Sequence, residues 1–171
     1  MSHDTTQHPA TTEPALSHTR RRWRDWTLAA TTGLALYSTG IAWQAQFVSY
    51  PLFGEVSAAE FPDYHLAYNA AIPLVVIVPG FLSFLTSAAL PWTRPADISG
   101  RTAALVCVAG LTALTSTVLW AIPMHDELDR IGQSPATLYG LLQANALRTS
   151  ALTLGSAALL WSLLRSRLRS R

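Results

Sequence analysis

The stretch that decides the fold comprises residues 139–164, YGLLQANALRTSALTLGSAALLWSLL. It is long enough to cross the apolar core of a bilayer, which takes roughly 20 helical residues. The strongly polar side chains of Asn145 and Arg148 lie inside it. An arginine inside a membrane-spanning helix is energetically costly, and it nearly always faces a protein interior, a cavity or a paired group. We therefore expect the rest of the chain to surround Arg148 with further helices.

The composition is typical of a membrane protein. Of 171 residues, 50% are hydrophobic and only 13% are charged, whereas soluble domains carry about 25% charged residues. The length suits one domain. Because Cys107 is the only cysteine, the chain has no internal disulfide and no chemistry that needs a cysteine pair.

Three other apolar segments are similar in length to residues 139–164. We expect four membrane-spanning helices, at about residues 26–48, 66–90, 102–122 and 139–164. The predicted fold class is an all-α integral membrane four-helix bundle within residues 20–165. Residues 1–19 are polar and rich in Thr, Pro and His, so we expect a disordered cytoplasmic tail there. Residues 166–171 are predicted to form a short basic cytoplasmic tail.

Arginines mark one side of the predicted bundle. They cluster before the first span, in the loop between spans two and three, and after the fourth span, whereas the other loops are mainly acidic. The positive-inside rule then places both termini in the cytoplasm, as in a multi-pass protein of the cell inner (plasma) membrane. The C-terminal arginines lie beside a span, so we expect them to contact anionic membrane lipids and not nucleic acid.

The outer connections are longer than the inner one. In residues 49–65 we expect two short amphipathic pieces that place Phe53, Phe61 and Tyr64 on the membrane face. In the second outer connection, Ser134 followed by Pro135 predicts the start of the fourth helix, because serine caps helices and proline favours their first turn.

Polar residues of all four helices fall at a similar depth, near the outer leaflet, when about 1.5 Å of rise is counted per residue. His65 and Asn69 are four residues apart, and Asn145 and Arg148 are three apart, so each pair shares a helix face. Proline kinks at Pro73 and Pro79 would open space beside them. The predicted catalytic residues are His65, His125, Asn145 and Arg148, and the predicted substrate-binding residues are Gln44, Tyr50, Tyr64, Tyr68 and Asn69.

Several functions of such a layer stay open. It can hold the helices together through interhelical hydrogen bonds, as in a non-catalytic membrane subunit or a lipid- or partner-binding protein. His65 and His125, with a nearby carboxylate, can also ligate a metal or a haem. A third function is an organic pocket without metal, in which histidine acts as acid or base and Arg and Asn stabilise an anion. The spans hold no carboxylate, which argues against proton-coupled transport.

Four short motifs connect the chain to a known family. They are Tyr50–Pro51 at the end of helix one, the Phe61–Tyr64–His65 segment, Ile122–Pro123–Met124–His125 after helix three, and Asn145-x-x-Arg148. With its four spans, the chain resembles the anthrone-oxygenase-like family of small membrane proteins over residues 25–165.

The resemblance implies a cofactor-independent oxygenase of secondary metabolism that acts on a lipophilic aromatic or polyketide-like small molecule. It also implies that His65, His125, Asn145 and Arg148 line the substrate site. The sequence leaves open the exact substrate and whether the protein forms a homo-oligomer.

Overall fold

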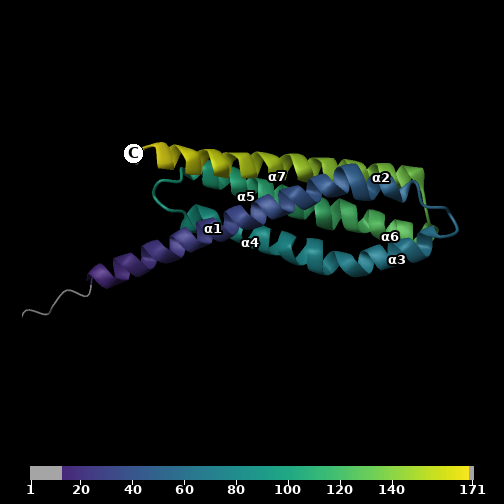
Figure 1. Cartoon of the computed structure of the whole chain (residues 1–171), viewed down its shortest axis with the longest axis horizontal. Helices are drawn as coiled ribbons and strands as arrows, with labels where there is room; N and C mark the ends of the chain where they lie inside the picture. Colours follow the sequence, from purple (N-terminus) through teal and green to yellow (C-terminus); the bar gives the residue numbers. More distant parts are fainter. Residues whose placement is uncertain (1–12, 170–171) are drawn as a thin grey trace, which may run out of the picture.

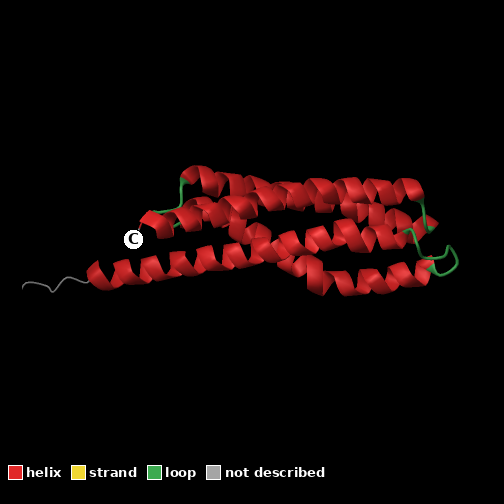
Figure 2. Cartoon of the chain, turned by 45° about the horizontal axis from the view of Figure 1, so that its top comes forward, coloured by secondary structure: helices red, strands yellow, loops and turns green. Residues whose placement is uncertain are grey.

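The computed structural model describes residues 13–169, and this part of the chain is helical without strands. Four long helical segments lie side by side (Figure 1, Figure 2). Their elements are α1 Glu13–Gln44, η1 Ala45–Ser49 and α2 Tyr50–Phe53; α3 Phe61–Ile72, η2 Pro73–Ile77 and α4 Val78–Thr93; α5 Gly100–Ser116, η3 Thr117–Ala121 and α6 Ile122–Ile131; and α7 Pro135–Arg169. The all-α prediction is confirmed for the described residues.

Two helix boundaries differ from the prediction. Helix α1 begins at Glu13, within the segment expected to be a disordered tail; residues 1–12 of that tail lie outside the described residues. The third segment does not end near residue 122 but continues through α6 to Ile131. Both extensions are polar. Hydropathy therefore predicts where the apolar run ends, and the helix continues beyond that point. Helix α7 starts at Pro135, as predicted, with Ser134 accepting a hydrogen bond from the Thr137 backbone N–H at 3.4 Å.

A π-helical turn widens each of the first three segments, and each turn lies next to a proline. Proline has no backbone N–H and its ring collides with the carbonyl of the preceding turn, so the helix must widen or kink. The distortion expected at Pro73 and Pro79 is therefore present as η2. The Val75 carbonyl, four residues before Pro79, accepts a hydrogen bond from the Tyr37 hydroxyl of α1 at 3.0 Å.

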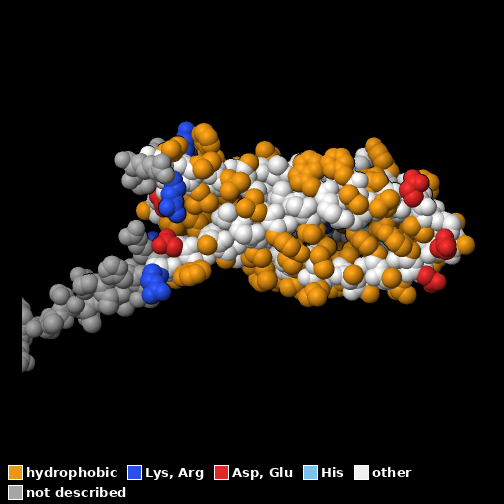
Figure 3. Space-filling view, viewed as in Figure 1, with side chains coloured by type: hydrophobic (Ala, Val, Ile, Leu, Met, Phe, Trp, Pro, Cys, Tyr) orange, Lys and Arg blue, Asp and Glu red, His pale blue; other side chains and the backbone are white. Residues whose placement is uncertain are grey.

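Three helices are long and apolar enough to cross a membrane by length and composition: 61–93, 100–131 and 135–168. The first segment, where we expected a span at 26–48, is not among them. Several of its threonines donate to the carbonyl four residues earlier, among them Thr27, Thr31 and Thr39, which satisfies these hydroxyls inside the helix. Figure 3 shows hydrophobic side chains along the length of the molecule, basic side chains gathered at one end, and acidic side chains at both ends.

Small residues let the helices approach closely. Helix α5 packs against α4 and α7, and α1 against the same two helices. A Cβ added at Gly110 would lie 3.0 Å from the Ser87 Cβ of α4, and one added at Gly155 would lie 3.0 Å from the Ala109 Cβ of α5. Close backbone contact of this kind is usual between membrane helices. Lipid tails are as apolar as the side chains, so the hydrophobic effect does not drive such helices together and close packing must do so.

We predict that Gly155→Leu lowers the stability of the protein by about 1–3 kcal/mol, because a larger side chain forces α5 and α7 apart. The matched control is Gly40→Leu, since nothing lies within 4 Å of a Cβ at Gly40. Thermal unfolding of the detergent-purified variants, followed by circular dichroism, measures the effect. Equal midpoints for the two variants would contradict the packing described here.

Candidate functional site

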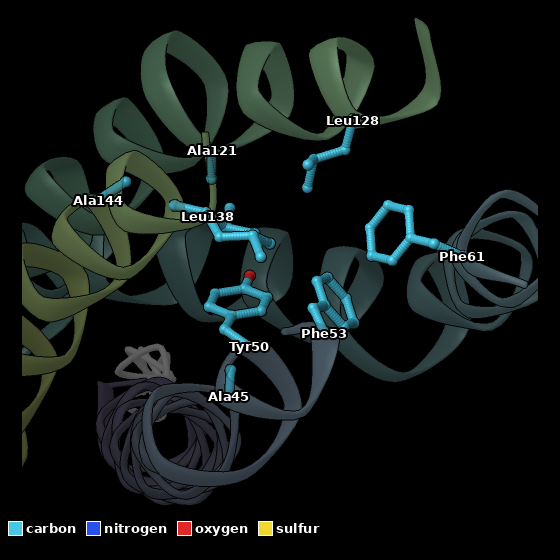
Figure 4. Close-up of a cluster of buried hydrophobic side chains, with 9 residues drawn as sticks. Ala45, Tyr50, Phe53, Phe61, Ala121, Leu128, Leu138 and Ala144 are labelled. Carbon is cyan, nitrogen blue, oxygen red and sulfur yellow. The ribbon is translucent and has the colours of Figure 1, made fainter. Parts of the chain in front are cut away.

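An aromatic core lies beneath the α2–α3 and α6–α7 connections (Figure 4). Phe53 and Phe61 are fully buried, with ring centroids 6.0 Å apart. The prediction that these two rings face the membrane was wrong. The loop between α2 and α3 folds both rings inward, where Phe61 stacks on His65 at 5.3 Å. Tyr64 lies on the rim, 39% exposed, against Phe53.

Two histidines and an aspartate form a continuous row of hydrogen bonds, which we call the histidine chain. The Nδ1 atom of His65 lies 2.6 Å from Oδ1 of Asp129, and the Nε2 atom of His65 lies 3.0 Å from Nδ1 of His125. Asn69, on the same face of α3 as His65, donates to both carboxylate oxygens of Asp129, at 3.0 and 3.3 Å. The predicted pair His65 and Asn69 is thus brought together, and Asp129 joins it from α6.

Asp129 was not among the predicted site residues. The acidic segment after helix three offered several carboxylates, and the sequence does not show which of them faces His65. One signal does exist: Asp129 follows His125 by four residues, so the two share a helix face once residues 122–131 are known to be helical.

A second group of polar residues surrounds Arg148, and we call it the arginine cluster. The Arg148 side chain is only 8% exposed. Its Nε and Nη2 atoms donate to Oδ1 of Asn145, with the Nε bond at 3.1 Å. Its other donors reach Oγ1 of Thr117 at 3.2 Å and the Tyr50 hydroxyl at 3.4 Å. All these acceptors are neutral, and among the described residues no carboxylate pairs with Arg148.

Asn145 connects the arginine cluster to the first helical segment. Its amide donates to the Ala42 carbonyl at 3.0 Å and to Oε1 of Gln46 at 2.7 Å. We expected Gln44 in this place, but Gln44 instead bonds to Ser49 at an exposed position. Residues two apart point to different sides of a helix, so only one of the two glutamines can face α7.

Tyr50 joins the two groups. Its hydroxyl accepts from Arg148, and its ring lies 5.8 Å from that of His125, edge to face. Tyr68 lies beside it, stacked 6.1 Å from His125. Of the nine predicted residues, the structure therefore brings together His65, Asn69, His125, Asn145, Arg148, Tyr50 and Tyr68, whereas Tyr64 is peripheral and Gln44 points away.

A cavity of about 270 Å³ lies between the helices, and Arg148 forms part of its wall. Its other walls come from α1, η2, α4, α5, η3, α6 and α7, and they are almost wholly apolar. Rim residues such as Val75, Phe81 and Val118 are also exposed on the apolar surface. The hydroxyl of Ser38 in the cavity wall is buried without a hydrogen-bond partner. The cavity thus offers an apolar ligand one cation and one unsatisfied hydroxyl.

The histidine chain is held by hydrogen bonds. Both ring nitrogens of His65 are bonded, one to Asp129 and one to His125. Among the side chains that the structure describes, no group of three or more His, Cys, Asp or Glu is placed to hold a metal. A metal or haem ligated by Nε2 of His65 would displace the hydrogen bond between His65 and His125.

Comparison with known proteins adds no relative. No family model, curated protein or solved structure matches the chain. The resemblance inferred from the four motifs therefore stays a prediction, and the site geometry alone carries the functional argument.

We predict that Asn145→Leu destabilises the fold by about 1–3 kcal/mol, because it removes an acceptor of two hydrogen bonds from a buried cation. In an Arg148→Met background the same substitution should cost less, since no buried charge is left unpaired. Denaturation of the four proteins of this double-mutant cycle in detergent measures the coupling. Gln44→Leu, which removes an amide outside the cluster, is the control. Additive effects of Asn145→Leu and Arg148→Met would contradict the assigned contact.

Proposed function

We propose that the protein is a small membrane enzyme that binds a lipophilic phenol of the anthrone type, holds its anion at Arg148, and lets the anion react with dioxygen without a cofactor. The observation that carries the proposal is the position of Arg148, a buried cation with only neutral partners in the wall of an apolar cavity. The four motifs shared with the anthrone-oxygenase-like family support the same reaction.

The charge of Arg148 selects the ligand. A buried guanidinium is stabilised far better by an anion than by neutral oxygens, because the attraction between opposite charges adds to the hydrogen bonds and is strong away from water. The cavity walls are apolar, so the rest of the ligand must be apolar as well. An aromatic phenol meets both conditions, since deprotonation places negative charge on its oxygen. Such a ligand dissolves in the bilayer and reaches the cavity through its apolar rim.

The reaction balances with dioxygen as the oxidant. A base removes one proton from the CH₂ group of the anthrone, and the resulting carbanion, delocalised as a phenolate, gives an electron to dioxygen. Recombination forms a C–O bond, and the peroxide takes up one proton. Loss of the second CH proton and cleavage of the O–O bond form the quinone carbonyl and release hydroxide, which becomes water. The net change is anthrone plus dioxygen to anthraquinone plus water.

The site residues have distinct roles in this proposal. Arg148 stabilises the anion that develops in the rate-limiting deprotonation, as hydrogen-bond donors do in an oxyanion hole, and Asn145 holds the guanidinium in position. His125, next to Tyr50 at the outer end of the cluster, is the base. The enzyme spans the inner membrane four times, with α1 as the remaining span and both termini in the cytoplasm, so that the arginine-rich end faces inward.

We predict that Arg148→Met lowers the rate of quinone formation about 10²- to 10³-fold, the usual cost of removing a donor that stabilises a developing anion. The assay follows quinone absorbance after an anthrone is added to the protein in lipid nanodiscs under air. Arg101→Met is the control, because Arg101 is an exposed arginine at the start of α5. Unchanged turnover in a folded Arg148→Met protein contradicts the proposal.

One observation favours a second function, that of a non-catalytic membrane subunit. Asn145 links α7 to both Ala42 and Gln46, which is what a purely structural polar contact between helices requires. In that case Arg148→Met would unfold or disassemble the protein, and wild-type protein would form no quinone above the rate in empty nanodiscs. Substitution of His125 would then have no effect on the assembly.

A further inference from the structure

We propose that Asp129, His65 and His125 form a proton relay between the aqueous outer face and the substrate site, in which Asp129 fixes the tautomers of both histidines. This inference rests on the proposed function for the reaction that it serves. It assigns a role to Asp129 and Asn69 as positioning residues, and to Nε2 of His125 as the atom that accepts the proton.

The directions of the hydrogen bonds follow from Asp129. An ionised carboxylate can only accept, so Nδ1 of His65 carries the proton that bridges the 2.6 Å contact. Neutral His65 then has a lone pair on Nε2, which accepts from Nδ1–H of His125 across 3.0 Å. His125 is therefore also protonated on Nδ1, and its Nε2 atom carries a lone pair. Among the described residues no side chain or backbone group donates to this Nε2 atom.

The side chains of the relay become more exposed from His65 to Asp129, so the relay leads from the interior to water. The side chain of His65 is 1% exposed, whereas that of Asp129 is 45% exposed. The Phe61 ring lies nearly parallel to that of His65 with centroids 5.3 Å apart, His125 meets the His65 ring through their hydrogen bond, and Phe53 meets it edge to face. These rings exclude water from the middle of the relay, so a proton that leaves His125 passes through His65 to reach the solvent.

The surroundings of the relay contain few other titratable groups. Tyr50 and Tyr68 contact His125, and Arg148 reaches it through the hydroxyl of Tyr50. Asn69 is uncharged, and it holds the Asp129 carboxylate by both oxygens. Asp129 is therefore the only carboxylate bonded to the two histidines in the described chain. Its 2.6 Å contact with Nδ1 of His65 is much shorter than the 3.4 Å contact of the Asn69 amide with the same atom, so the carboxylate sets the proton position.

Each proton transfer is balanced and reversible. Nε2 of His125 accepts the proton from the substrate, Nδ1–H of His125 passes its proton to Nε2 of His65, and Nδ1–H of His65 passes its proton to Asp129. The peroxide and the leaving hydroxide each take up one proton, and reversal of the same steps supplies it. Because the protons return along the path by which they left, both tautomers are restored without a ring flip.

The substitution Asp129→Asn reverses the direction of the hydrogen bonds in the relay. The asparagine amide donates to Nδ1 of His65, which moves the His65 proton to Nε2. His65 then donates to Nδ1 of His125, and the His125 proton moves to Nε2, so the site no longer has a base. The corresponding change in serine proteases leaves the geometry intact and lowers kcat by about 10⁴ through the wrong tautomer.

The first experiment measures tautomers and needs no substrate. The full chain, with ¹⁵N-labelled histidine and with His3, His8 and His18 changed to Gln, is studied by NMR in detergent at about pH 8. We expect Nδ1–H on both His65 and His125 in the wild-type relay, Nε2–H on both in Asp129→Asn, and the wild-type pattern in Asp129→Glu. Asp126→Asn, an exposed carboxylate on the same helix, is the control and should change nothing. Wild-type tautomers that survive in Asp129→Asn overturn the relay.

The second experiment measures turnover. Asp129→Asn should lower kcat for quinone formation about 10²- to 10⁴-fold, the usual range for loss of a general base, with KM nearly unchanged and with recovery in Asp129→Glu. Normal kcat in Asp129→Asn overturns the catalytic role of the relay. If wild-type protein forms no quinone, the proposed oxygenase function fails, whereas the NMR result still decides whether Asp129 sets the two tautomers.

Discussion

The stabilisation of one buried guanidinium constrains the arrangement of this protein more than any other interaction. Arg148 cannot face lipid, and it finds no carboxylate among the described residues, so it must collect neutral acceptors from several helices. Tyr50 comes from α2, Thr117 from η3 and Asn145 from α7. Because Asn145 is itself held by the first segment, the charge of one side chain fixes the relative positions of three helical segments.

The π-helical turns make that arrangement possible. Each adds width to a helix next to a proline, where an ordinary turn would lose a hydrogen bond or collide with a carbonyl. Residues of η2 and η3 line the cavity whose wall includes Arg148. The Val75 carbonyl is satisfied by Tyr37 from another helix. The distortion thus creates space beside the cation without leaving this backbone oxygen unbonded.

The two polar groups differ in the environment that they face, and the proposed reaction uses both. In that proposal the apolar cavity beside Arg148 receives a substrate that arrives dissolved in lipid. The partly exposed carboxylate of Asp129, at the end of the histidine chain, holds the proton between its removal and its return. Tyr50 contacts both groups.

The sequence by itself determined the helical class, the start of α7 at Pro135, the distortion at Pro73 and Pro79, and most of the polar residues that the structure brings together around His65 and Arg148. These features follow from local properties: the length of apolar runs, proline chemistry and helical spacing. Only the tertiary structure decided that Gln46 and not Gln44 meets Asn145, that Phe53 and Phe61 are buried, and that Asp129 is the carboxylate of the site. His65 and Asp129 are 64 residues apart, and contacts over such separations depend on how helices pack, which no local pattern contains.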